Sequence, residues 1–265
     1  MTIVTALSIY LTLGAVAGTM AGVFGVGGGL IIVPVLVFAF GLQNIASEIV
    51  MHLAIGTSLA TILVTGSSST LGHYRRGSIH RGWLTALLPG LVLGSIAGAF
   101  IADNLSGTAL GTMFGIFVLL IAAKMVFGLT PKPGSASPGK WIMTLAGGVI
   151  GAVSALFGIG GGAMTVPLLS RCGASMTQAV GTAAAVGLPI ALVGALAFIV
   201  VGWGNPLLPA WTTGFVMWPA FFSIVVTSVP FARLGVKLAH VLPAHVLRLS
   251  FALLLAVVGV RFLLT

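Results

Sequence analysis

The stretch GVFGVGGGLIIVP, residues 22–34, places five glycines and a closing proline inside apolar sequence that would otherwise predict one unbroken helix. Glycine and proline are the residues that most disfavour a helix interior. A second copy, ALFGIGGGAMTVP, occupies residues 155–167, so that Gly27–Gly29 recur as Gly160–Gly162 after an interval of 133 residues. The repetition predicts that the chain uses the same helix break twice.

The composition of the chain is that of a protein surrounded by lipid. Of its 265 residues 58% are hydrophobic and 5% are charged, whereas a soluble domain carries about 25% charged residues. Apolar runs long enough to cross a bilayer recur along the chain and predict a polytopic membrane protein. The net charge of +9 comes from basic residues in short loops and at segment ends. We therefore expect the basic residues to orient the chain in the bilayer and expect no nucleic-acid partner.

Ten apolar segments divide into two halves. The first five span roughly residues 3–22, 28–42, 47–72, 83–102 and 107–128, and the second five roughly 141–156, 161–171, 176–201, 211–232 and 243–263. Between the halves lies TPKPGSASPGK, whose proline, glycine and serine mark a polar linker. We predict an N-terminal transmembrane repeat over 1–129, a cytoplasmic linker over 130–140 and a C-terminal transmembrane repeat over 141–265.

The two halves match at further positions. Gly14 and Gly18 fall on Gly147 and Gly151 at the same interval of 133, and AIGTS, residues 54–58, falls on AVGTA, residues 179–183, at an interval of 125. Internal duplication is the simplest explanation.

The basic residues predict how each half lies in the bilayer, because cytoplasmic loops are enriched in Lys and Arg. With the N-terminus outside, ten of the eleven basic residues fall inside or at inner segment ends, and Arg261 alone falls outside. The ten are Arg75, Arg76, Arg81, Lys124, Lys132, Lys140, Arg171, Arg233, Lys237 and Arg248. The first half then begins outside and the second begins inside.

We therefore predict an all-α polytopic membrane protein built from two inverted repeats of about five helical segments each, with a glycine-broken short helix in each half. In transporters of this plan the substrate lies near the membrane midplane, between the repeats.

The glycine runs predict the chemistry of the site. Segments 28–42 and 161–171 are too short for a core about 30 Å thick, at about 1.5 Å per residue, so each reads as a half-helix that begins inside the membrane. A helix N-terminus has unpaired N–H groups and a partial positive charge, and glycine lets an anion approach them. We expect a small anionic substrate at Gly27, Gly28, Gly29, Gly160, Gly161 and Gly162. The alternative is that these glycines serve helix packing, which is our interpretation of the GxxxG runs at 14–22 and 90–98.

Four further residues are candidates for substrate contact. Thr57, with Ser58 beside it, lies about ten residues into its segment, hence about 15 Å deep, and Thr182 is the equivalent of Thr57 in the second half. The alternative is that each threonine bonds a carbonyl of its own helix. His52 shares a helix face with Glu48 and is a candidate for substrate or proton handling, because ionisable residues within membrane segments are commonly functional.

The quoted glycine phrases, with GTS and GTA at 56–58 and 181–183, HYRRG at 73–77 and FARLGVKLAHVLP at 231–243, resemble the sulfite exporter TauE/SafE family of membrane permeases. The resemblance implies an all-helical permease that moves sulfite, sulfonates or related organic anions across the bacterial inner membrane. Two features depart from it. Ser58 is matched by Ala183, so this hydroxyl has no equivalent in the second half, and GSIHRGW lacks the acid that often precedes the tryptophan.

The sequence thus favours a secondary transporter of small anions, with a passive anion channel as the alternative. An intramembrane enzyme is disfavoured, because the sequence has no metal-ligand spacing and pairs no serine or cysteine with a mid-membrane base. The single cysteine, Cys172, allows no intrachain disulfide or cysteine metal cluster. We expect no cofactor and no metal, and the sequence indicates no oligomeric state.

The distribution of basic residues predicts the topology directly. Reporter fusions should place the linker 130–140 in the cytoplasm and both chain termini in the periplasm. A cytoplasmic C-terminus combined with a cytoplasmic linker would contradict the inverted arrangement of the halves.

Overall fold

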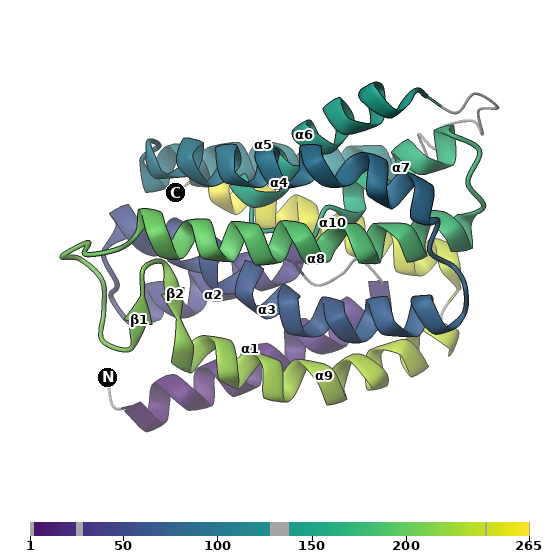
Figure 1. Cartoon of the computed structure of the whole chain (residues 1–265). Coiled ribbons are helices and arrows are strands. Elements are labelled where there is room, and N and C mark those ends of the chain that lie inside the picture. The colour runs from purple at the N-terminus through teal and green to yellow at the C-terminus, as the bar shows by residue number, and fades with distance from the viewer. Residues whose placement is uncertain (1–2, 25–28, 128–137, 242, 265) are drawn as a thin grey trace.

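The computed structural model describes residues 3–24, 29–127, 138–241 and 243–264. These residues form ten helices and one two-stranded hairpin (Figure 1). The elements are α1 (Ile3–Phe24), α2 (Gly29–Leu42), α3 (Ser47–Arg75), α4 (Arg81–Asp103), α5 (Gly107–Val126), α6 (Lys140–Leu156), α7 (Gly162–Arg171), α8 (Met176–Val201), β1 (Thr212–Thr213), β2 (Val216–Met217), α9 (Trp218–Val241) and α10 (Ala244–Leu264). The predicted all-α class is confirmed.

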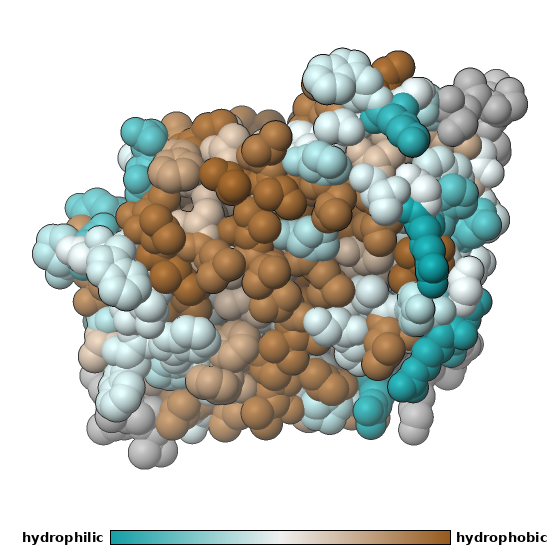
Figure 2. All heavy atoms as spheres, in the orientation of Figure 1, coloured by the Kyte–Doolittle hydropathy of each residue, from teal (hydrophilic) through white to brown (hydrophobic). Residues whose placement is uncertain are grey.

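Six of these helices are long and apolar enough to cross a membrane. They are α3, α4, α5 and α8, with Trp218–Gly235 of α9 and His245–Leu264 of α10. A hydrophobic belt covers the middle of the face in Figure 2, and hydrophilic residues gather along its edges, most strongly at the right. Such a belt is stable only against lipid, so the chain is a multi-pass membrane protein.

The two helices that follow the glycine breaks are short, as predicted. Helix α2 has 14 residues and α7 has 10, which correspond to about 21 Å and about 15 Å. They lie at opposite ends of the bundle, α2 at the left and α7 at the right of Figure 1. Neither reaches across a hydrocarbon core of about 30 Å on its own.

Close packing of α4 against α6 depends on glycine. A Cβ on Gly90, Gly94 or Gly98 of α4 would overlap backbone atoms of Thr144, Gly148 and Ala152 of α6. Small residues let two membrane helices approach closely enough for extensive van der Waals contact. The GxxxG run at 90–98 therefore lies in a helix–helix seam.

The seam between α1 and α9 repeats that arrangement. Gly14 and Gly18 of α1 abut Ile224 and Ser228 of α9, while their equivalents in α6 abut Leu87 and Leu91 of α4. An interval of 137 residues relates Leu87 to Ile224 and Leu91 to Ser228. Helices α5 and α10 cross where Gly115 and Gly259 each lie against the other's carbonyl oxygen. A twofold relation between the halves produces this reciprocity, and it supports the predicted division at the linker.

Helix α3 lies at the centre of the core. Every residue from Ile49 to Ile62 is buried, and α8 packs beside it. In the second half the chain differs from the prediction of a helix over 211–232, because α9 begins only at Trp218 and residues 212–217 form the β1–β2 hairpin. Gly214 has a φ of 52° at the turn, and Phe215, Val216 and Met217 are buried. The positive φ breaks the helical path and turns these side chains into the core.

The α4–α6 seam makes a matched pair of variants possible. Gly90→Ala should lower the melting temperature in detergent, because the new methyl group meets the α6 backbone and overpacking typically costs about 1–3 kcal/mol. Gly148→Ala, in the same seam, should have little effect, since the nearest atom to its Cβ lies 3.9 Å away. Equal melting temperatures for the two variants would contradict this account of the seam.

Candidate functional site

The described parts of the two glycine breaks meet in the core. A Cβ on Gly29, the first residue of α2, would lie 2.8 Å from both the Gly158 carbonyl oxygen and the Ile159 Cα. From this contact α2 runs towards one end of the bundle and α7 lies towards the other (Figure 1). The predicted site residues Gly27 and Gly28 lie outside the described residues.

The second break is a pair of tight turns. Helix α6 ends at Leu156, and the N–H of Ile159 donates to the carbonyl of Ser154 at 2.9 Å. Gly158 and Gly161 have φ values of 67° and 72°, a region that side chains disfavour. Gly161 is the N-cap of α7 and offers no side-chain acceptor. The first turn of α7 therefore begins inside the protein without a side-chain cap for its N–H groups.

The three predicted glycines of this break have different surroundings. The Gly160 carbonyl lies close to Gly187 of α8, and Ile190 crowds Gly161. For Gly162, by contrast, no heavy atom among the described residues lies within 4 Å of the position that a Cβ would take. Gly162 thus borders unfilled space at the first turn of α7.

Ser58 fixes the second break to the central helix. Its buried hydroxyl donates to the Gly158 carbonyl oxygen at 2.8 Å. The equivalent residue, Ala183, lacks a hydroxyl, so the first half makes a contact that the second half does not return.

Thr57 and Thr182 make a reciprocal pair of hydrogen bonds between the halves. The backbone N–H of Met217 donates to Thr57 Oγ1 at 3.0 Å, and that of His80 donates to Thr182 Oγ1 at 2.9 Å. Both threonines are fully buried. The interval of 125 relates the two acceptors, and 137 relates the two donors. Each central helix therefore holds the segment that leads into a spanning helix of the other half.

The glycines before these threonines allow that approach. A Cβ on Gly56 would overlap the Phe215 carbonyl oxygen, and a Cβ on Gly181 would lie 2.8 Å from the Ser78 carbonyl oxygen. Ser78 and Phe215 are again related by 137 residues. Glycine is required here because the backbones touch.

His52 is buried and contacts the protein through both ring nitrogens. Nε2 lies 2.9 Å from the Ala102 carbonyl oxygen and Nδ1 lies 3.2 Å from that of Glu48, while the Phe215 ring lies 5.2 Å away between centroids. A neutral imidazole has one N–H to donate and the imidazolium has two, so the protonated ring suits both contacts. The only two acids of the sequence, Glu48 and Asp103, lie on this part of α3 and at the end of α4.

Sequence reasoning missed two hydroxyls near the second break. Ser154 Oγ and Thr165 Oγ1 are fully buried and have no hydrogen-bond partner among the described residues. The signal was present in the comparison of the copies, because GLIIVP of the first half becomes GAMTVP in the second and places Thr165 where the first half has Ile32.

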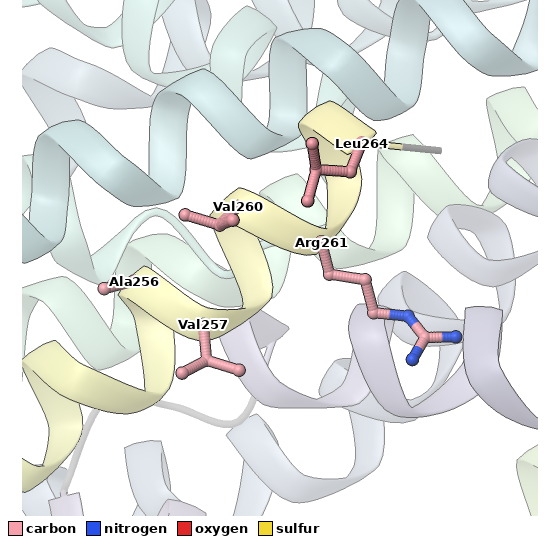
Figure 3. A pocket seen from close by; sticks show the side chains of 5 residues that line it. All are labelled: Ala256, Val257, Val260, Arg261 and Leu264. Atoms are coloured by element: carbon pink, nitrogen blue, oxygen red, sulfur yellow. The ribbon is translucent and has the colours of Figure 1, made fainter.

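Two other features contribute no binding chemistry. An open hollow on α10 is lined by Ala256, Val257, Val260, Arg261 and Leu264 (Figure 3), and none of these residues belongs to a glycine break. Within the described part of the chain, no group of three or more His, Cys, Asp or Glu side chains is arranged to hold a metal ion.

Spanning helices, paired glycine breaks and reciprocal contacts define a membrane protein of the transporter class. The chain belongs to the Sulfite exporter TauE/SafE family, which it matches over residues 10–262.

Several relatives are similar over most or much of the chain. A probable membrane transporter protein of Haemophilus influenzae is 36% identical, over 98% of this chain and 99% of its own length. The probable membrane transporter protein MJ0441 of Methanocaldococcus jannaschii is 25% identical, over 97% and 96%. The probable membrane transporter protein YunE of Bacillus subtilis is 29% identical, over 61% and 66%. No solved structure matches the chain.

The reciprocal threonine bonds lead to a stability prediction. Thr57→Val and Thr182→Val should each lower the melting temperature, because each leaves a buried N–H unpaired at a cost of about 1–3 kcal/mol. Thr182→Ser should retain most of the stability. Thr61→Val is the control, since the buried Thr61 hydroxyl donates to the Thr57 carbonyl of its own helix. If Thr61→Val is as destabilising as the other two, the bonds between the halves have no special role.

Proposed function

We propose that this protein is a secondary transporter of small anions, most simply sulfite or organosulfonates, in the bacterial inner membrane. The substrate class comes from the family, whose name describes sulfite export. The alternating movement of a carrier suits two repeats joined around one site.

One observation carries the proposal: Gly29 and Gly158–Ile159, from the two glycine breaks, are in contact. Two half-helices that start beside each other direct their partial positive charges to one place. Gly160, Gly161 and Gly162 supply the backbone of the second half-site, and we assign Gly27, Gly28 and Gly29 to the first.

Backbone groups provide the attraction in this arrangement. A helix N-terminus contributes about 0.3–1 kcal/mol, and up to ~2 kcal/mol in a partly buried geometry. Two such ends with several N–H donors would support micromolar to millimolar affinity, since each 1.4 kcal/mol is about tenfold. A carrier needs affinity in this range because it must also release its substrate.

The remaining predicted residues have distinct roles in the proposal. Ser58 holds the second break in place through Gly158. Thr57 and Thr182 hold the two halves together as hydrogen-bond acceptors and keep their hydroxyl protons for donation to the anion. His52, held by two carbonyls, is the proposed carrier of a proton if transport is proton-coupled.

The arrangement of the helices supports the proposed orientation. The start of α1 and the end of α10 lie at one end of the bundle, and the start of α6 lies at the other (Figure 1). We propose that the first end is periplasmic and that the linker 130–140 is cytoplasmic, as the basic residues indicate.

A passive anion channel could use the same site, and counterflow distinguishes the two. In vesicles, unlabelled sulfite on the far side should accelerate the entry of labelled sulfite through a carrier and not through a pore. An absence of acceleration, with transport intact, would favour the channel.

The same vesicles test the location of the site. Gly162→Ala should weaken the apparent affinity for sulfite about tenfold while the protein keeps its melting temperature, because the methyl group enters the unfilled space at the first turn of α7. Gly41→Ala is the control, since Gly41 is an exposed helical glycine that also has open space around its Cβ position. Wild-type affinity in Gly162→Ala would exclude this turn as the anion site.

A further inference from the structure

Ser154 and Thr165 flank the first turn of α7 from two sides. Ser154 belongs to α6, and its Oγ lies 3.4 Å from the position that a Cβ on Gly161 would take. Thr165 lies four residues after Gly161, one turn along the same face of α7. Because helical side chains lean towards the N-terminus, the Thr165 hydroxyl lies over that first turn.

Thr165 departs from the behaviour of the other helical threonines. Eight of them donate their hydroxyl to the carbonyl four residues earlier: Thr12, Thr19, Thr61, Thr65, Thr85, Thr112, Thr144 and Thr227. This back-bond is the usual way to satisfy a threonine in a membrane helix. Thr165 Oγ1 makes no such bond, although it is fully buried.

A buried hydroxyl without a partner is costly, and two beside one uncapped helix start require an explanation. Ser106 and Ser175 cap α5 and α8 through their side chains, whereas Gly161 gives α7 no such cap. The first turn of α7 thus combines uncapped N–H groups with two hydroxyl protons that have no acceptor among the described residues. All of these groups are donors, so an anion with several acceptor oxygens satisfies them together.

We infer that Ser154 and Thr165 donate hydrogen bonds to the transported anion and, with the first turn of α7, form the polar half of the binding site. This assignment rests on the proposed function. Their equivalents in the first half are Ala21 and Ile32, which have no hydroxyl. The site is therefore asymmetric: the second half selects an oxyanion by side-chain donors, and the first half offers no side-chain donor at these two positions.

The test measures sulfite affinity and the stability of the ligand-free protein in parallel. Ser154→Ala and Thr165→Val should each weaken sulfite binding about tenfold, by loss of a hydrogen bond to a charged group. Neither should lower the melting temperature without ligand, because each removes an unsatisfied hydroxyl. Thr165→Ser keeps the donor and should retain wild-type affinity.

Ser95→Ala is the matched control. Ser95 Oγ is also buried and without a partner among the described residues, but Ser95 lies in the α4–α6 seam against Gly151, so its removal should leave affinity unchanged. The assignment fails if Ser154→Ala and Thr165→Val bind sulfite as the control does, or if they lose stability and keep affinity. A wild-type protein that moves neither sulfite nor an alkyl sulfonate would overturn the proposed function, and this assignment with it.

Discussion

The need to satisfy backbone polar groups without water is the constraint on which the rest of this structure depends. In hydrocarbon an unpaired N–H or C=O costs several kcal/mol, so a chain that spans a bilayer is helical wherever it can be. This chain interrupts a helix twice, before α2 and before α7, and the interruptions lie in the core against α3. Ser58 satisfies the Gly158 carbonyl exposed by the second interruption. The first-turn N–H groups of α7 have no side-chain cap, which is consistent with a site that binds a ligand.

The reciprocal contacts explain how the halves are held around that core. Glycine lets α4 lie on α6 and α1 lie on α9 at backbone distance, and the two seams follow the same residue intervals. The threonine bonds repeat the pattern at the centre, where each central helix holds the segment before a spanning helix of the other half. Movement of one half against the other has to pass through these few hydrogen bonds, whereas the glycine seams can slide as packed units.

The two halves have also diverged where they meet the break. Ser58 is matched by Ala183 in the comparison of the copies, Thr165 stands in place of Ile32, and Ser154 stands in place of Ala21. Duplication supplies two similar backbones, and substitutions in one copy then give the site a polar side and an apolar side. An asymmetric molecule such as a sulfonate, with an anionic head and an organic remainder, suits a site of that kind.

Composition and periodicity alone determined the class, because a chain with 5% charged residues can be stable only in lipid. The matched glycine phrases predicted two short helices, and α2 and α7 have nearly the predicted bounds. The sequence did not reveal that 212–217 form a hairpin, because its apolar residues are equally compatible with the start of α9. It also did not show what Thr57, Thr182 and His52 contact, since those partners lie 50 to 160 residues away. Hydrogen bonds between distant segments depend on how the helices pack, and only the tertiary structure decides that.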